Sequence, residues 1–180
     1  MADVGLMGIP FPETYGGVGG SFLDLAIAME EIGRALVPGP FLQTVVSCGM
    51  AILEFGTDSQ RQAFIPNIAT GATAMALATL EPGAPPESLA ISTYSMPSKE
   101  GYVITGTKVF VPFAPMADYF LVSAREGHSD RPESGINVFL VDSRSSGVET
   151  EVLQTRAKNQ QYEVRFVGTT VPAENLLGEP

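Results

Sequence analysis

Apolar residues recur every three or four positions in the first part of the chain, which is the spacing of amphipathic helices. Ser21 stands where an N-cap is expected, and Asp24, three residues later, completes a capping box. One apolar stripe follows, formed by Phe22, Leu25, Met29, Ile32 and Leu36. The pattern therefore predicts a helix that begins after Ser21 and packs through this stripe.

The next helical segment, Val45 to Phe55, is apolar on nearly every side and carries Glu54 as its one charge. This pattern predicts a buried helix, and Cys48 within it is interpreted as a buried structural thiol. Thr57 and Gln60 form a second capping box, which predicts the start of a third helix. The residues expected to face inward from that helix are Phe64, Ile65 and Ile68.

The pattern changes near Gly71, beyond which short runs rich in β-branched and aromatic residues alternate with turns. Strands are predicted at residues 74–79, 102–105, 109–111, 119–122, 136–141 and 162–166. Nothing of helical length separates them, so we expect an antiparallel barrel or sandwich. The predicted fold class is α+β, with a partial helical domain at residues 1–71 and a β domain at residues 72–180.

Composition narrows the classes of function. The 180 residues carry a net charge of −10, which argues against nucleic acid as a partner. Because Cys48 and His128 are the only residues of their types, a disulfide, a metal cluster and a Ser-His-Asp triad are not expected. No apolar run reaches the roughly 20 residues that cross a bilayer, and no signal segment is found at Met1. We expect a cytoplasmic protein without membrane contact.

Six motifs follow one another along the chain and together carry a resemblance. They are residues 8–17 (GIPFPETYGG), 29–33 (MEEIG), 56–66 (GTDSQRQAFIP), 76–84 (ALATLEPGA), 106–110 (GTKVF) and 171–178 (VPAENLLG). Each motif alone is a weak signal, but their order and spacing are similar to those of acyl-CoA dehydrogenases. The resemblance covers the whole chain.

This resemblance implies an N-terminal helical domain and a middle β domain. It also implies α,β-dehydrogenation of an acyl-CoA thioester with FAD as hydride acceptor, an electron-transfer acceptor, and a homo- or hetero-oligomer. In the family, the general base is in most members a glutamate of a C-terminal four-helix domain, which would lie beyond Pro180. No catalytic residue is therefore assigned here, and the 180-residue chain alone is expected to be inactive.

The matched motifs imply site residues. In the family, the loop that corresponds to residues 77–86 runs along the flavin, which assigns cofactor contacts to Leu77, Thr79, Leu80, Glu81 and Gly83. A serine near the end of that loop meets the acyl-CoA or the phosphates, a role carried over to Ser88. The second contact strand assigns Phe110, Val111 and Pro112, with the Phe110 ring stacked on the flavin.

Two assigned positions depart from the family pattern. Leu80 stands in place of a threonine, and Pro112 stands in place of a threonine or serine near the flavin N5 and has neither hydroxyl nor N–H. These departures keep open a non-catalytic companion subunit of a heteromeric acyl-CoA dehydrogenase with a degenerate flavin site. A flavin oxidase or monooxygenase on the same fold is a third alternative, which no separate feature of the sequence favours. A surface turn at residues 77–86 and a core role for Phe110 also remain open.

Overall fold

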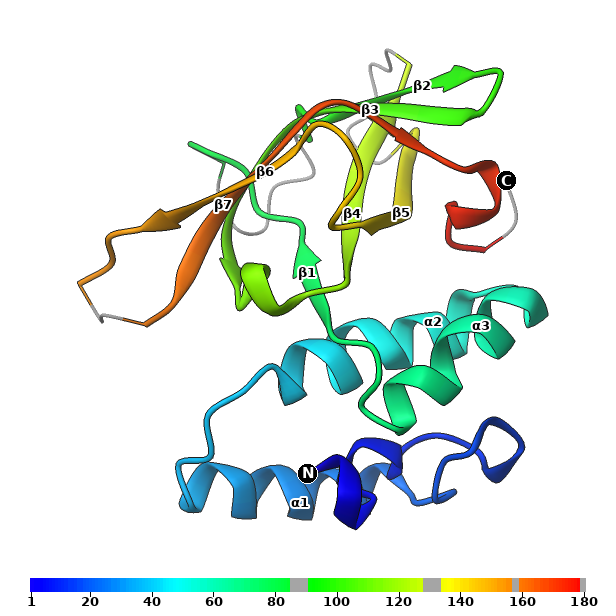
Figure 1. Cartoon of the computed structure of the whole chain (residues 1–180), viewed down its shortest axis with the longest axis vertical. Helices are drawn as coiled ribbons and strands as arrows, with labels where there is room; N and C mark the ends of the chain where they lie inside the picture. Colours follow the sequence, from blue (N-terminus) through cyan, green and yellow to red (C-terminus); the bar gives the residue numbers. More distant parts are fainter. Residues whose placement is uncertain (85–90, 128–133, 157–158, 179–180) are drawn as a thin grey trace.

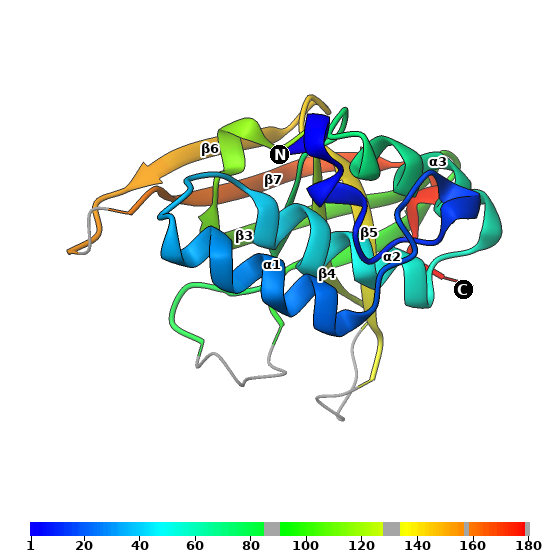
Figure 2. The same ribbon diagram turned by 90° about the horizontal axis from the view of Figure 1, so that it is seen from below.

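The computed structural model describes residues 1–84, 91–127, 134–156 and 159–178, in which helices lie across one face of a curled sheet (Figures 1 and 2). The helices are α1 (Phe22–Arg34), the π-helix η4 (Leu42–Gly49), α2 (Met50–Phe55) and α3 (Asp58–Ala69). The strands are β1 (Met75–Ala78), β2 (Tyr94–Ser98), β3 (Gly101–Pro112), β4 (Tyr119–Glu126), β5 (Ile136–Asp142), β6 (Val148–Leu153) and β7 (Gln161–Val171). Short 3-10 turns are η1 (Ala2–Val4), η2 (Leu6–Gly8), η3 (Glu13–Tyr15), η5 (Ala114–Met116) and η6 (Ala173–Asn175).

Both predicted capping boxes are confirmed. The Ser21 hydroxyl accepts from the Asp24 N–H at 3.3 Å, and the Asp24 carboxylate accepts from the Ser21 N–H at 2.8 Å. Thr57 and Gln60 make the same reciprocal pair at the start of α3. These bonds satisfy N–H groups that the first turn of a helix leaves without partners, which explains why the helix starts are readable from the sequence.

The predicted apolar stripe of α1 is buried only in its middle. Leu25 is buried, whereas Phe22 is 68% exposed and Leu36 is 85% exposed. The helix ends at Arg34, so Leu36 lies beyond it with a positive φ of 50° and no longer shares the helical face. Phe22 is the first helical residue. The predicted burial of these two ends of the stripe is wrong.

The predicted helix at residues 45–55 is divided between η4 and α2. Its buried residues include Val45, Cys48 and Ile52, but Phe55 at the end of α2 is 67% exposed, which corrects the expectation of burial on every side. Cys48 is confirmed as a buried thiol, and burial raises its pKa to about 12. Among the described residues, no helix has the length and apolar character needed to span a membrane.

The sheet has the order β1-β4-β2-β3-β7-β6, and β5 pairs with β4. The β2–β3, β3–β7, β4–β5 and β6–β7 pairs are antiparallel, whereas β4 is parallel to both β1 and β2. The α+β fold class is confirmed, but the expected antiparallel sheet is a mixed one. Two parallel strands need a long connection between them. Between β1 and β4 this connection contains the β2–β3 hairpin, so no crossover helix is required.

The strands predicted at residues 102–105 and 109–111 are parts of one strand, β3. Gly106 stands between them, and a Cβ there would come within 2.4 Å of the Thr93 hydroxyl oxygen, so only glycine fits without a shift. Strands β2 and β6 were not predicted from the sequence. Both are short, and β6 is largely exposed, so they show weak apolar patterns.

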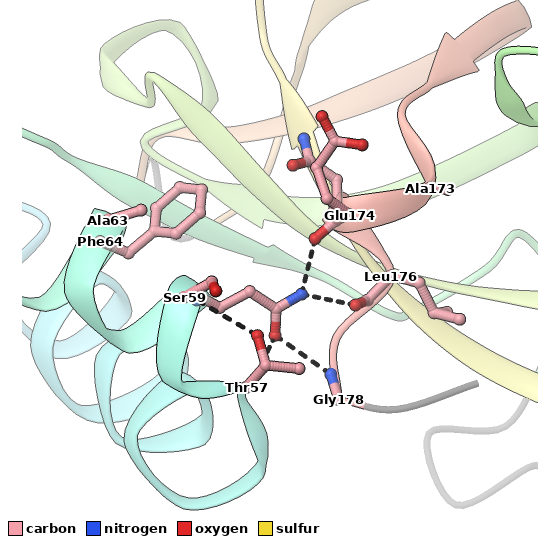
Figure 3. Close-up of a pocket in the computed structure, with 10 residues that line it drawn as sticks. Thr57, Ser59, Ala63, Phe64, Ala173, Glu174, Leu176 and Gly178 are labelled. Atoms are coloured by element: carbon pink, nitrogen blue, oxygen red, sulfur yellow. Dashed lines mark hydrogen bonds between the residues drawn. The ribbon is translucent and has the colours of Figure 1, made fainter.

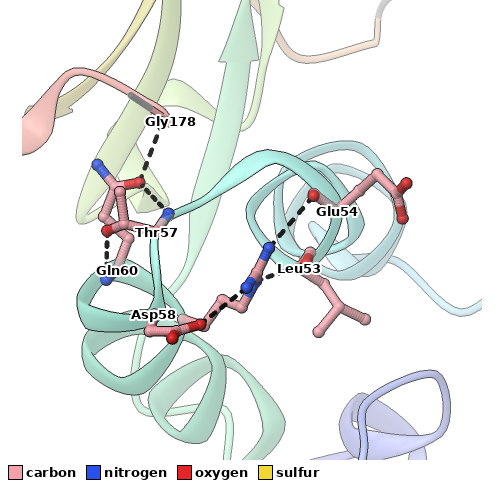
Figure 4. A network of polar contacts seen from close by, with 7 residues as sticks. Leu53, Glu54, Thr57, Asp58, Gln60 and Gly178 are labelled. Atoms are coloured by element: carbon pink, nitrogen blue, oxygen red, sulfur yellow. Dashed lines mark hydrogen bonds and ion pairs between the residues drawn. The ribbon is translucent and has the colours of Figure 1, made fainter. Parts of the chain in front are cut away.

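The side-chain amide of Gln60 joins the helices to the C-terminal end of the described chain. Its Nε2 donates to the carbonyl oxygens of Glu174 at 2.8 Å and Leu176 at 2.5 Å. Glu174 and Leu176 also line a pocket of about 470 Å³ (Figure 3). Its Oε1 accepts from the N–H groups of Thr57 at 3.0 Å and Gly178 at 3.2 Å (Figure 4). A buried amide with four directional bonds fixes the position of the segments it joins.

We expect Gln60→Ala to lower the free energy of unfolding by about 2–4 kcal/mol, because it removes these bonds and leaves buried backbone groups unpaired. Urea unfolding followed by circular dichroism measures the change. The control is Gln62→Ala at an exposed position of the same helix, which should change the free energy by less than about 0.5 kcal/mol. Equal effects of both substitutions would contradict the role of Gln60 in holding the C-terminal segment on α3.

Candidate functional site

Three segments far apart in the sequence surround a pocket of about 550 Å³, called here the β3 pocket. They are the turn Glu81–Ala84 after β1, residues Val109 and Phe110 of β3, and residues 153–156 at the end of β6. The last segment is Leu153, Gln154, Thr155 and Arg156. The pocket therefore lies where two loops meet an irregular part of the central strand β3.

A β-bulge orients Phe110 toward this pocket. The pairing of β3 with β7 shifts register between Lys108 and Val111. At the bulge Phe110 has a φ of 55°, and this residue is 55% exposed while the next residue, Val111, is fully buried. A left-handed conformation is unfavourable for a bulky residue, and such strain often occurs at functional sites. An exposed aromatic ring held this way is a natural binding surface.

The facing turn is open. Gly83 has a φ of 73°, and among the described residues no atom beyond its two chain neighbours lies within 4 Å of the place where its Cβ would stand. The turn is closed by a hydrogen bond from the Ala84 N–H to the Glu81 carbonyl at 3.3 Å. A second bond, from the Val109 N–H to the Leu80 carbonyl at 2.9 Å, ties the turn directly to β3. The two walls are thus connected by backbone contacts.

A buried ion pair stands behind both walls. The ammonium of Lys108 lies 2.7 Å from a carboxylate oxygen of Glu81, 3.2 Å from the Ser123 hydroxyl and 3.4 Å from the Thr79 carbonyl. The Lys108 side chain is fully buried, and that of Glu81 is 6% exposed. The Glu81 carboxylate also accepts hydrogen bonds from the Ser92 N–H at 2.6 Å and from the Thr93 N–H at 3.0 Å.

These contacts shift both pKa values. Burial opposes ionisation of Glu81, but the Lys108 ammonium and the two backbone N–H groups outweigh it, so the pKa of Glu81 lies below its ordinary value. Burial lowers the pKa of Lys108, and Glu81 counteracts that shift in part. The carboxylate is therefore ionised and directed at Lys108 and the backbone rather than into the pocket.

The structure brings together some of the residues that the sequence analysis assigned to the cofactor. Glu81, Gly83 and Phe110 all line the β3 pocket. Leu77 packs against the helical core, and Val111 belongs to the core of the sheet.

The remaining assigned residues lie around these. Thr79 is exposed, Leu80 is half-buried beside Val109, and Pro112 ends β3 opposite Gln161. Ser88, assigned to the acyl-CoA, lies outside the described residues.

Sequence reasoning missed two features of the site. Residues 153–156 carry no motif, and only the pairing of β6 with β7 brings them to the pocket. Lys108 is part of the motif at residues 106–110, but no feature of the sequence distinguishes it from the other scattered charges.

Comparison with known proteins gives the family. The models for the N-terminal and the middle domain of acyl-CoA dehydrogenases match residues 1–72 and 74–168. A probable acyl-CoA dehydrogenase, YngJ, of Bacillus subtilis is 33% identical over 100% of this chain and 49% of its own length. The short-chain-specific acyl-CoA dehydrogenase of Clostridium acetobutylicum is 33% identical over 99% of this chain and 48% of its own.

Solved structures agree with this. The ChsE4-ChsE5 complex from Mycobacterium tuberculosis contains a chain that is 30% identical, with a TM-score of 0.91 over 99% of this chain and 46% of that one. The fold is that of an acyl-CoA dehydrogenase-like α+β protein. The chain belongs to the acyl-CoA dehydrogenase family, and it spans about half the length of the curated relatives it matches.

The buried carboxylate predicts a pH dependence of stability. Since the folded pKa of Glu81 lies below its ordinary value of 4.5, its contribution is fully present above that value and is lost as the pH falls through the folded pKa. We expect Glu81→Gln to be less stable than the unsubstituted protein at neutral pH, with the difference shrinking in acid. Urea unfolding at a series of pH values measures it.

The control is Glu30→Gln, which changes an exposed carboxylate paired with Arg34. Exposed pairs of this kind contribute little, so this variant should follow the unsubstituted protein at every pH. A difference between Glu81→Gln and the unsubstituted protein that stays constant from neutral to acidic pH would contradict an ionised Glu81.

Proposed function

We propose that the β3 pocket holds the flavin of an FAD-dependent acyl-CoA dehydrogenase, and that this chain supplies helical and β walls around FAD and an acyl-CoA. The observation that carries the proposal is the exposed ring of Phe110, held at a bulge in one pocket with the open turn at Gly83. Both residues belong to motifs through which the chain resembles its family. Cofactor contacts at the other assigned positions stay predictions.

A bound FAD would supply the acceptor for the hydride that leaves the β carbon of the acyl thioester when a base removes the α proton. The described residues fit the binding part of this task. The ring of Phe110 offers an aromatic face for a planar heterocycle, and the turn around Gly83 leaves room for close approach to the backbone. Backbone N–H groups of an open turn are suited to carbonyl and anionic oxygens.

The proposal extends to the whole protein. It includes an electron-transfer acceptor, a cytoplasmic location, and a homo- or hetero-oligomer. A structural relative described as a complex, ChsE4-ChsE5, supports the assembly.

A non-catalytic companion subunit with a degenerate flavin site is the second candidate. Leu80 and Pro112 favour it, since neither residue offers a hydroxyl where the family places one. Pro112 also lacks an N–H. The two candidates differ in one measurable property, which is how tightly the unsubstituted protein holds FAD.

The test combines Leu80→Thr with Pro112→Thr in the complete protein. We expect FAD binding to tighten by about five- to a hundredfold, because each of the two added hydroxyls contributes a hydrogen bond of roughly 0.5–1.5 kcal/mol net. Titration followed by flavin fluorescence measures the affinity. The matched control is Val167→Thr, which adds a hydroxyl at a 60% exposed position of β7 outside the pocket.

Unchanged affinity in the double variant would place both positions away from the flavin and contradict the proposed site. If the unsubstituted protein binds no FAD and the double variant does, the companion subunit is the better description. Binding in both, tighter in the double variant, supports the enzyme.

A further inference from the structure

The Lys108–Glu81 pair occupies a place where apolar residues would serve packing equally well. Lys108 is among the largest fully buried side chains, together with residues such as Phe120, Phe139 and Phe166 that are apolar. Replacing a buried ion pair by apolar residues of similar volume often leaves stability unchanged or higher. Packing alone therefore does not account for a charge at this position.

The pair differs from an apolar contact in that its bonds have direction. Lys108 on β3 reaches Glu81, the Thr79 carbonyl and the Ser123 hydroxyl on β4. The Glu81 carboxylate in turn accepts the N–H groups of Ser92 and Thr93, just before β2. One carboxylate thus holds both ends of the segment from residue 81 to residue 92.

Each member of the pair stands directly beside a pocket wall. Glu81 is followed by Pro82, Gly83 and Ala84 of the turn, and Lys108 is followed by Val109 and Phe110 of the bulge. The hydrogen bond from the Val109 N–H to the Leu80 carbonyl joins the same two segments through their backbones. A displacement of either charged residue would therefore move a wall of the pocket.

We infer that Lys108 and Glu81 are positioning residues, whose buried pair fixes the Glu81–Ala84 turn against the Phe110 bulge and so sets the shape of the flavin-binding pocket. The flavin part of this inference rests on the proposed function. Neither side chain needs to touch the cofactor, because the pair acts through the backbone of the adjacent wall residues. Supporting contacts of this kind commonly control the geometry of a binding site.

The experiment replaces the pair by an apolar one, Glu81→Leu with Lys108→Met, in the complete protein. Three quantities are measured: the thermal unfolding midpoint, the hydrogen exchange of the Gly83, Ala84 and Val109 amides without flavin, and the FAD dissociation constant with the visible circular dichroism of bound flavin. The control is Glu30→Gln with Arg34→Met, which removes an exposed pair.

We expect the apolar variant to unfold at a lower midpoint, because the N–H groups of Ser92 and Thr93 lose their acceptor. The three amides should exchange faster, and FAD should bind at least about tenfold more weakly with an altered flavin spectrum. Unchanged exchange and unchanged FAD binding would overturn the inference and leave the pair a packing element. If no variant, including the unsubstituted protein, binds FAD but exchange still accelerates, the positioning role holds and the flavin function fails.

Should the apolar variant not fold, Glu81→Gln takes its place. The amide keeps the shape of the side chain but adds N–H donors where the carboxylate accepts from Lys108, Ser92 and Thr93. The inference is supported if the substitution raises the exchange rates of the Gly83 and Ala84 amides, relative to the unsubstituted protein, more than those of the α3 amides. Equal changes at both places contradict it.

Discussion

Strand β4 is buried on both faces, and the rest of the fold is arranged around it. Phe120 and Val122 belong to the cluster inside the curled sheet, while Leu121 between them belongs to the cluster under the helices. A strand in such a place needs apolar cover on both sides and pairing partners along its edges. Strands β1, β2 and β5 supply the pairing, and η4 and α3 contribute to the helical cover.

Within this apolar frame, two buried polar groups specify position. The Gln60 amide places the C-terminal segment on α3, and the Lys108–Glu81 pair places the turn after β1 on β3. Both are satisfied by several partners, which is the condition for a polar group in a low-dielectric interior to be tolerated. An apolar core would hold these segments together, but only directional bonds hold them in one register.

The β3 pocket contains both the bulge at Phe110 and the open turn at Gly83 in a chain that carries Leu80 and Pro112. Leu80 and Pro112 change the hydrogen bonds that the pocket can offer. The proposed enzyme and the proposed companion subunit therefore share this pocket and differ in the donors that positions 80 and 112 would offer to a flavin.

The sequence by itself determined the helix starts and the change from helices to strands, because capping boxes and alternation act between residues a few positions apart. It also placed Glu81, Gly83 and Phe110 in one candidate site, through their motifs. Residues 153–156 could not be assigned to the site from the sequence, because they belong to no motif.

Only the tertiary structure decided that β1 pairs parallel with β4, that a bulge turns Phe110 outward, and that Lys108 is buried against Glu81, 27 residues away. Whether a lysine on a strand faces solvent or a carboxylate depends on which segments pack over that strand. That packing is a property of the assembled chain, and no local pattern of residues contains it.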